Sequence, residues 1–468
     1  MWRFLGGGIY YGWVVVAVAF TTLAVGGSAN GSFGIFYGYI LKDLGGSRSS
    51  TALAFSITML VFGFGGPLIG RALDRFGPRL VVPAGVCILG LGLVLSSRVT
   101  SLWQLYLVYG IVAAFGVTAL GFLPVTASAA SWFVERRGTA ISIALAGRGV
   151  GSLLLFPFYQ HLITTYGWRS AYLLMAVLIV IVLCPLNLFL QRPFPRGASV
   201  ADRERARRLP GRGLRLEVVD EAWTTTEWTV GKALRTRQLW YLVIIGFFGG
   251  ISFSAIGVHQ VQHLVDSGFD RMLAVSVLAS VGILRSFGGI LGGVVSDRIG
   301  RELAYTLGAA LSMLGVASLL SIAWIGALWP LYVYVGCYGI GNSMASSIDA
   351  STQGDIWQGA HLASILGIIV LGSGLGGAVG PWVAGYVFDR WQTYVPAFLL
   401  ILLLTLCSIL GMWLLAPRNI RRITRQAEPL RGAAAGEDFG SAAASLPLLN
   451  APAPGEINRA AAGLASSE

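Results

Sequence analysis

The amino-acid sequence predicts an all-α integral membrane protein whose twelve transmembrane helices form two pseudo-symmetric six-helix bundles. The 468 residues are 55% hydrophobic and 12% charged, whereas an ordinary soluble domain carries about 25% charged residues. Apolar runs of about 20 residues, long enough to cross about 30 Å of hydrocarbon, recur about twelve times. A short motif of Gly, Asp and Arg also recurs after 223 residues, which indicates two related halves.

The first six predicted helices occupy residues 1–190 and the second six occupy residues 238–416. Each is an apolar run bounded by Gly, Pro or charged residues. In the first half the predicted helices are 11–41, 50–71, 79–97, 102–132, 139–161 and 168–190. In the second half they are 238–265, 271–295, 303–323, 328–349, 362–386 and 395–416.

Two polar segments lie outside the predicted bundles. Residues 191–237 are rich in Arg and are predicted to form a central loop that tethers the halves, and residues 417–468 a disordered tail. An even number of helices places both termini on one side, and 25 of the 33 Lys and Arg residues lie on that side, against six on the other. This bias predicts cytoplasmic termini, loop and tail in a plasma (cell inner) membrane.

The net charge of +12 does not indicate nucleic acid as a partner. The basic residues lie between the apolar runs, which fits loops beside lipid headgroups better than a nucleic-acid groove reader. The four cysteines stand singly in apolar runs, without the paired spacing of a zinc site or a disulfide framework. We expect no metal, no cofactor and no catalytic constellation, and therefore no enzyme.

The repeated motif follows the second and the eighth predicted helices. We expect its Gly residues to let helices approach closely, and its Asp and Arg residues to cap helix ends and pair across the halves. Such a latch would favour one conformational state. The alternative is a tight turn that only adds to the positive-inside bias. The predicted latch residues are Gly70, Asp74, Arg75, Gly77, Arg79, Gly293, Asp297, Arg298, Gly300 and Arg301.

This pattern resembles the major facilitator superfamily, whose loop signature after helix 2 reads Gly-x-x-x-Asp-Arg-x-Gly-x-Arg and recurs weakly after helix 8. The resemblance covers about residues 10–416 and implies the major facilitator fold, alternating access and a solute site near the midplane between the halves. Four stretches are similar to the monocarboxylate and oxalate/formate branch: Gly12-Trp13-Val14, Gly31-Ser32-Phe33-Gly34-Ile35-Phe36, Trp132-Phe133-x-x-Arg136-Arg137-Gly138 and Gly380-Pro381.

Two Arg residues fall inside predicted spans. Arg148 lies nine residues after Thr139, about 13 Å into its helix, and Arg285 lies twelve residues before Asp297, about 18 Å from the helix end. A buried Arg costs roughly 2.5–3.5 kcal/mol on insertion scales, so it normally faces a cavity or a partner. The resemblance implies that helices 5 and 8 face each other, and we expect both side chains to bind carboxylate oxygens. Alternatively, either Arg pairs with backbone carbonyls or a buried acid and only shapes packing.

The match to monocarboxylate transporters is partial at the expected site. Their helix 8 carries an Arg before the second motif, and Arg285 matches it. Val281 stands where animal members have an Asp, Asn30-Gly31 corresponds to their helix 1 Lys, and Leu362–Tyr386 lacks the Lys of oxalate/formate exchangers. No Asp or Glu falls at the midplane of any predicted span, which argues against a cationic substrate.

Five further polar residues are candidates. We expect Asn30 in helix 1 and Tyr338 and Asn342 in helix 10 to contribute to the substrate site. His259 and His263 lie four residues apart on one face of helix 7 and could relay protons, because the pKa of His is near neutral. Alternatively, the two His residues form a polar face near the membrane interface. They lack a third ligand for a metal site.

These observations predict a secondary active transporter that moves a small organic anion, a mono- or dicarboxylate, by proton-coupled symport. The alternatives are an anion exchanger of the oxalate/formate type, an exporter of a neutral or amphipathic compound and, from another class, a membrane sensor that does not transport. A sensor needs an output domain, and neither the loop nor the tail has the hydrophobic content to form one. The expected partners are the anion, a proton or counter-anion, and membrane lipid, and the resemblance implies a monomer.

Overall fold

The computed structural model describes residues 4–5, 9–121, 124–125, 128, 132, 137–192, 215–357 and 362–424. All of the described residues, and with them the described membrane helices, belong to one compact unit, residues 1–424. Most of the predicted tail, and residues 193–214 of the predicted central loop, lie outside the described residues.

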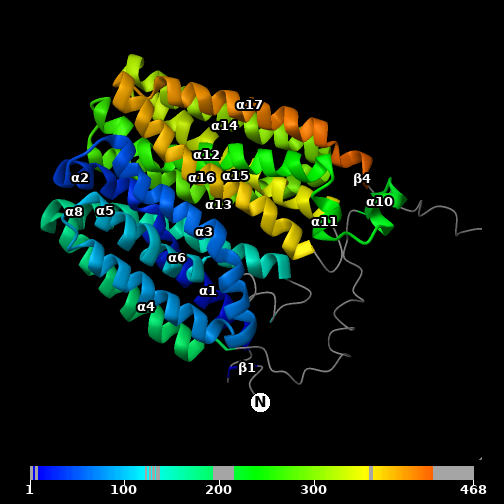
Figure 1. The fold of residues 1–468 in the computed structure, drawn as a ribbon, viewed down its shortest axis with the longest axis horizontal. Coiled ribbons are helices and arrows are strands. Elements are labelled where there is room, and N and C mark those ends of the chain that lie inside the picture. Colours follow the sequence, from blue (N-terminus) through cyan, green and yellow to red (C-terminus); the bar gives the residue numbers. More distant parts are fainter. Residues whose placement is uncertain are drawn as a thin grey trace, which may run out of the picture. The chain divides into compact units, whose positions relative to one another are not determined.

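The N-terminal half contains the first six predicted spans (Figure 1). Its helices are α1 (Tyr11–Gly31), α2 (Phe33–Leu44), α3 (Arg48–Phe76), α4 (Pro78–Ser96), α5 (Leu102–Leu105), the π-helix η1 (Tyr106–Ala113), α6 (Ala114–Leu120) and α8 (Arg137–Leu190). Together α1 and α2 make the first span, and α5, η1 and α6 belong to the fourth. The long α8 is interrupted at Gly167, so this one label covers two helices, the fifth and the sixth spans.

The C-terminal half contains the other six spans, one to a helix. They are α12 (Arg237–Asp266), α13 (Arg271–Ile299), α14 (Arg301–Ile325), α15 (Trp329–Ile356), α16 (Leu362–Trp391) and α17 (Val395–Leu415). Ten stretches of the described chain are long and apolar enough to cross a membrane, and one of them, Ile143–Leu190, holds two spans. The 28-residue α15 supplies the remaining one. The predicted all-α fold of twelve spans is confirmed.

Local signals set the ends of these helices. A capping box begins α3: the Ser47 side chain accepts from the Ser50 backbone N–H, and the Ser50 hydroxyl accepts from the Ser47 N–H. The two copies of the repeated motif end α3 and α13 at Gly77 and Gly300, whose φ angles of 74° and 91° favour glycine. The next helix starts directly after each glycine, so the motif reverses the chain in one residue.

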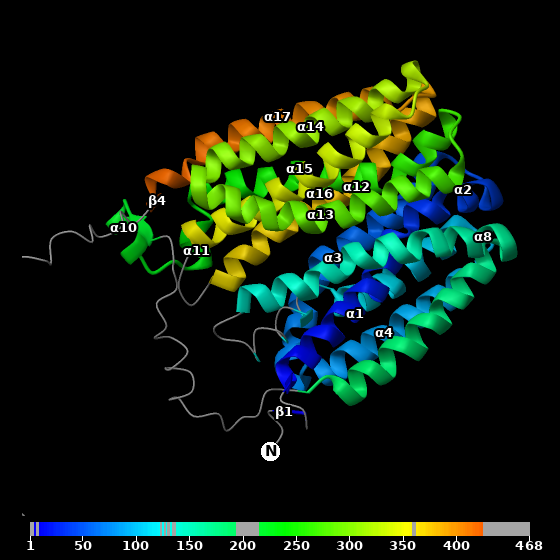
Figure 2. The same cartoon turned by 180° about the vertical axis from the view of Figure 1, so that it is seen from behind.

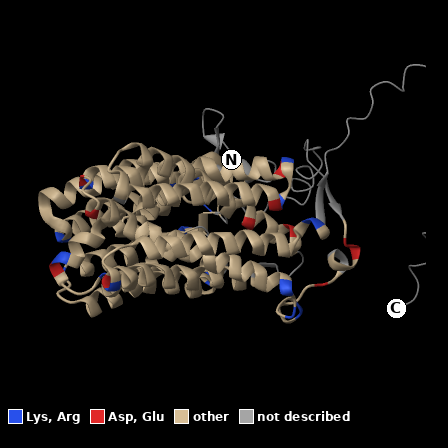
Figure 3. Cartoon of the chain, turned by 90° about the horizontal axis from the view of Figure 1, so that it is seen from above, with Lys and Arg blue, Asp and Glu red and all other residues tan. Residues whose placement is uncertain are grey.

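The two halves meet mainly along two pairs of helices, α3 with α16 and α8 with α13, and α2 also packs against α12. In both Figure 1 and Figure 2, α4 lies on the outer side of the N-terminal half, and α14 and α17 lie on the outer side of the C-terminal half. Charged side chains gather near the two ends of the helices, whereas the middle is largely uncharged (Figure 3). This distribution suits helices whose midsections face hydrocarbon.

Successive connections lie at opposite ends of the antiparallel helices. We call the end with the α2–α3 and α16–α17 connections the Arg48 end. We call the end with the Gly77 and Gly300 turns the Gly300 end. The sequence predicts that the Gly300 end is cytoplasmic.

The last part of the central loop packs against the C-terminal half at the Gly300 end. Here α10 (Glu221–Thr225) and α11 (Val230–Ala233) precede α12. The rings of Trp223 and Trp228 lie 4.3 Å apart, and both contact the fully buried Trp357 at the end of α15. A cluster of three indoles therefore fixes a segment whose composition is mostly polar.

Two small antiparallel pairings complete the described chain. Strands β1 (Phe4–Leu5) and β2 (Ile9–Tyr10) pair before the first span. Strands β3 (Arg215–Val218) and β4 (Arg421–Thr424) join the central loop to the segment after α17.

Candidate functional site

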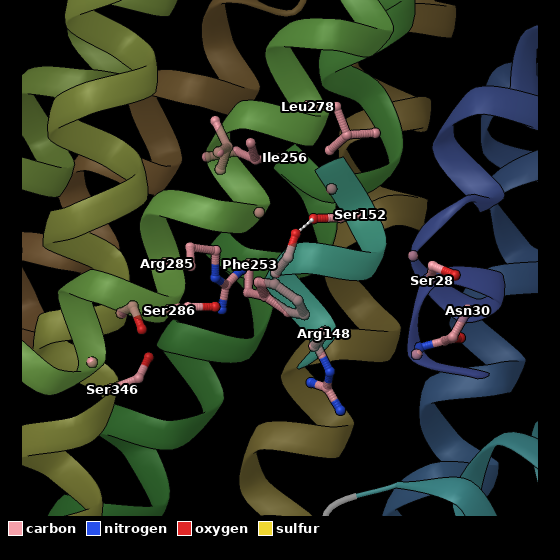
Figure 4. Close-up of a pocket in the computed structure, with 18 of the residues that line it drawn as sticks. Ser28, Asn30, Arg148, Ser152, Phe253, Ile256, Leu278, Arg285, Ser286 and Ser346 are labelled. Carbon is pink, nitrogen blue, oxygen red and sulfur yellow. Dashed lines mark hydrogen bonds between the residues drawn. The ribbon is translucent and has the colours of Figure 1, made fainter. Parts of the chain in front are cut away.

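A cavity of about 570 Å³ lies between the two halves. Helices α1, α2, α3 and α8 line it from the N-terminal half, and α12, α13 and α15 from the C-terminal half. Because both bundles contribute walls, a movement of one bundle against the other changes the shape of this space. We call it the central cavity; Figure 4 shows its lining.

Arg148 of α8 and Arg285 of α13 both line the central cavity. Neither guanidinium has a hydrogen bond or an ion pair with any residue that the structure describes. The Arg285 guanidinium lies 4.3 Å from the centroid of the Phe253 ring, a cation–π contact, and Figure 4 shows the Arg148 side chain extending away from Ser152. Two cations without an anionic partner therefore share one cavity, which is an arrangement that suits an anion.

Small residues bring the helices that carry the two arginines close together. A Cβ added at Gly149 would lie 2.8 Å from the Gly282 carbonyl oxygen, so only glycine fits there without a shift. The Ser152 hydroxyl lies 3.5 Å from the Ala279 carbonyl oxygen across the same crossing and donates to the Gly149 carbonyl at 2.8 Å. Arg148 directly precedes Gly149, and Arg285 directly precedes Ser286, whose hydroxyl faces Gly149 across the crossing. Both Arg side chains therefore lie at the edge of this helix–helix contact.

Glycine in α1 leaves room for Arg148. A Cβ added at Gly27 would lie 3.4 Å from Arg148 Nε and 3.5 Å from its Cγ. Gly27 itself lines the central cavity. Any side chain larger than that of alanine at this position would press on the guanidinium.

Three polar candidates from the sequence have buried atoms without a hydrogen-bond partner among the described residues. They are the amide oxygens of Asn30 and Asn342 and the hydroxyl of Tyr338. Asn30 and Tyr338 line the central cavity. Buried polar atoms are normally hydrogen-bonded, so these three are available to a ligand or to water.

The Tyr338 ring stacks on a second tyrosine. The centroids of the Tyr334 and Tyr338 rings lie 5.3 Å apart, and the Tyr334 hydroxyl donates to the Gln260 side-chain oxygen. Gln260 also lines the central cavity. The sequence did not single out Tyr334 as a site residue, because the feature that places it there is the hydrogen bond of its hydroxyl to Gln260 of α12.

The predicted proton-relay pair, His259 and His263, lies outside the central cavity. His259 Nε2 lies 2.8 Å from the Pro381 carbonyl oxygen, and His263 Nε2 lies 3.2 Å from the Leu319 carbonyl oxygen. A carbonyl can only accept, so both Nε2 atoms carry the hydrogen. Both side chains are buried; the His259 ring also contacts the Tyr37 ring of α2, and the His263 ring contacts the Phe398 ring of α17. Their role as a relay stays a prediction.

Arg48 joins the two halves at the Arg48 end. Its guanidinium donates to Asp266 Oδ2 at 2.5 Å and to the Tyr394 hydroxyl at 2.7 Å, and it lies 3.5 Å from the centroid of the Phe388 ring. Its backbone N–H donates to Asp389 Oδ1 at 2.8 Å. All of these partners belong to the C-terminal half, whereas Arg48 begins α3.

This polar network continues to His259. The Tyr394 hydroxyl, which accepts from Arg48, donates to His259 Nδ1 at 3.1 Å. Burial raises the pKa of the Tyr394 phenol above its ordinary value, so the phenol keeps the proton that it donates. The sequence did not single out Arg48, because nothing in the local sequence points to partners more than 200 residues away.

A second cavity, of about 310 Å³, lies beside the central one. It is lined mainly by the C-terminal half, and Arg285 and Phe253 line both cavities. Asn342 and Asp349 of α15 also line it. The prediction placed Asp349 at the boundary of its span, but α15 continues for seven further residues, so this carboxyl group lies within the helix.

The described contacts of the predicted latch residues stay within their own halves. Arg301 pairs with Asp297 at 3.1 Å and with Asp355 at 2.8 Å, and Arg79 donates to a carbonyl of α8 at 3.0 Å. The side chain of Asp74 is outside the described part of the chain. Pairing of the motif across the halves stays a prediction.

Among the residues that the structure describes, no three His, Cys, Asp or Glu side chains form a group that could hold a metal ion. The four cysteines, all in described helices, form no disulfide bond. The polar groups that converge on the cavities are therefore amides, hydroxyls, two guanidiniums and one carboxyl group.

Comparison with known proteins agrees with this geometry. The family model described as Major Facilitator Superfamily matches residues 16–353. The chain is 29% identical to monocarboxylate transporter 13 of Rattus norvegicus over 393 residues, which cover 83% of the chain and 85% of that protein. It is 24% identical to monocarboxylate transporter 2 of Homo sapiens over 453 residues, 92% of each protein.

The fold is similar to that of a solved bacterial homolog of the human lysosomal transporter Spinster in an inward-facing and unoccupied conformation. The TM-score is 0.64 at 13% sequence identity, and the match covers 88% of this chain and 98% of that chain.

Proposed function

This chain belongs to the Major Facilitator Superfamily, and from that premise we propose that it carries a small mono- or dicarboxylate across the membrane by alternating access. As a transporter related to monocarboxylate transporters, it is not an enzyme. The substrate class, the coupling to protons, the plasma membrane and the cytoplasmic termini are parts of the proposal.

The observation that carries the proposal is the pair of unpartnered guanidiniums in the central cavity. An Arg buried in a membrane protein is costly unless it meets an anion, a carbonyl or water. Arg148 and Arg285 meet no anion among the described residues, and they approach the cavity from opposite halves. A carboxylate bound between them would accept bidentate hydrogen bonds and would draw the halves together.

The remaining lining suits a small acid with an apolar body. Asn30 and Tyr338 offer polar atoms that lack partners in the described structure, while Phe253, Leu278 and Val281 offer apolar contacts. A cavity of about 570 Å³ holds a small acid together with water. The names of the rat and human relatives support the same substrate class.

The way the halves meet supports alternating access. Arg48 binds three elements of the C-terminal half at one end, whereas the described hydrogen bonds and ion pairs of the latch residues at the Gly300 end remain within each half. We infer that this conformation is closed at the Arg48 end. Breaking the Arg48 contacts and joining the halves at the Gly300 end would expose the cavity to the other side.

The test is uptake of radiolabelled lactate, pyruvate, formate, oxalate and succinate into proteoliposomes by the wild-type protein and by Arg285→Gln. Loss of a charge-assisted hydrogen bond costs about 1.5–3 kcal/mol, so KM for the transported acid should rise by about 10- to 150-fold. Arg98→Gln, at an exposed position of the Arg48 end, is the matched control and should keep the wild-type KM. Uptake that is unchanged by Arg285→Gln would overturn the anion site.

Aromatic side chains favour a second candidate, export of an amphipathic compound. Phe55, Phe156 and Phe253 line the central cavity from three different helices. Protection of growing cells against an apolar drug, with no uptake of any of the five acids, would support this candidate over the first.

A further inference from the structure

One carboxyl group within a membrane helix takes no part in the proposed anion site. Asp349 lies seven residues before the end of α15, about 10 Å along the helix. Its Oδ2 accepts from the Gln353 amide at 2.9 Å, while its Oδ1 is buried and has no hydrogen-bond partner among the described residues. No described residue forms an ion pair with it.

The surroundings of Asp349 contain few charges. From α13 the cavity is lined by Arg285, and from α14 by Tyr305. The lining residues from α3, α12, α16 and α17 carry no titratable group, and the nearest side-chain donor on α15 itself is the neutral Gln353. A buried carboxylate needs a cation or several donors, and one amide supplies a single hydrogen bond.

The other membrane-embedded candidates for a proton carrier are already occupied. His259 and His263 donate to backbone carbonyls, and Asp355 is paired with Arg301. Asp389 accepts hydrogen bonds from the backbone of α3. Asp349 is the carboxyl group in the described helices that combines a buried oxygen without a hydrogen-bond partner and a place in a cavity that adjoins the anion site.

We propose that Asp349 binds the proton that this transporter moves together with its anion. The inference rests on the proposed function, because it assigns the coupling of the same site. Arg285 connects the two events, since it lines both the central cavity and the cavity of Asp349.

Charge explains how the two sites are coupled. When Asp349 is ionised it opposes a second negative charge near Arg285; when it is protonated, the two guanidiniums act on the anion alone. Proton binding therefore raises the affinity for the anion, and by thermodynamic reciprocity the anion raises the affinity of Asp349 for the proton. The loaded carrier then holds one proton and one carboxylate, which is the stoichiometry of symport for a monoanion.

The functional test compares two modes of transport in proteoliposomes, using whichever of the five acids the wild-type protein transports best. One mode is accumulation driven by an inward pH gradient, with protons followed by entrapped pyranine. The other is exchange of labelled for unlabelled acid at equal pH. Asp349→Asn mimics the protonated carboxyl group, so it should lose at least about tenfold in driven accumulation and keep exchange within about twofold.

The outcomes separate the inference from the proposed function. Asp349→Glu should restore coupling. Driven accumulation at the wild-type level by Asp349→Asn would overturn the inference and leave the anion site intact, and so would equal loss of both modes with no rescue by Glu. Absence of all uptake by the wild-type protein would overturn the proposed function and this inference with it.

Infrared difference spectroscopy of the purified protein gives a readout that needs no substrate. A carboxyl C=O band should appear as the pH is lowered, and it should be missing in Asp349→Asn. Asp355→Asn removes a carboxylate on the same helix that is paired with Arg301 and should keep the band. A band that persists unchanged in Asp349→Asn would overturn the inference.

Discussion

Replacing Arg48 by Ala should open the Arg48 end of the molecule. The guanidinium makes a charge-assisted hydrogen bond to Asp266, a second hydrogen bond to Tyr394 and a cation–π contact with Phe388, and its side chain is only 14% exposed. The backbone contact with Asp389 survives the substitution, because it uses the N–H of residue 48. The variant therefore loses the side-chain part of the contact between the halves.

The size of the effect follows from these contacts. Hydrogen bonds to a charged group contribute about 1.5–3 kcal/mol, and a cation–π contact adds about 0.5–1 kcal/mol. Two such hydrogen bonds and the ring contact sum to about 3.5–7 kcal/mol. Because Asp266 is partly exposed, we take the lower end, about 3.5 kcal/mol lost from the state closed at this end, which lowers the ratio of closed to open molecules about 300-fold. Arg48→Lys keeps the charge but not the planar fork, so its effect should be intermediate.

Spin-label distance measurements test this expectation. Labels on cysteines at Lys42 and Arg390, exposed positions of opposite halves at the Arg48 end, would be introduced after replacement of the four native cysteines. Arg48→Ala should add a population at longer distance, and Arg98→Ala, at the same end, should not. A distance distribution identical in the two variants would refute the reasoning.

Two further substitutions test packing. Gly149→Ala places a methyl group 2.8 Å from the Gly282 carbonyl oxygen, so transport should fall at least about tenfold. The control is Gly336→Ala, whose methyl group meets nothing within 4 Å and should leave transport unchanged. Equal activity of the two variants in a transport assay would contradict the close crossing. Trp357→Ala removes the fully buried ring of the indole cluster and should destabilise the protein by about 3–5 kcal/mol. The melting temperature in detergent should fall, and an unchanged melting temperature would contradict the packing.

Much of the fold could be predicted from the sequence because the membrane imposes local rules. Apolar length sets each span, and a glycine after Asp-Arg-x sets the turns at Gly77 and Gly300. The confirmed fold and superfamily both rest on such short-range signals. Arg148 and Arg285 also stood out locally, since a charge inside an apolar run is conspicuous wherever it occurs.

The interaction partners could not be predicted in this way. Arg48 bonds to Asp389 across 341 residues, and His259 contacts Pro381 and Tyr394, which lie more than 120 residues away. Asp349 was missed because it lies at the polar end of its run, where a span and its flanking loop look alike. Whether a buried polar atom has a hydrogen-bond partner depends on how several helices pack together.

The sequence by itself therefore determined the number of helices, the duplication and the two membrane arginines, because hydrocarbon thickness and the cost of buried charge act on each segment separately. Only the tertiary structure decided which groups share a cavity, which carboxyl group is left without an ion-pair partner, and at which end of the helices Arg48 joins the two halves. Those properties arise from contacts between α3 and α16 and between α8 and α13, segments that are far apart in the chain.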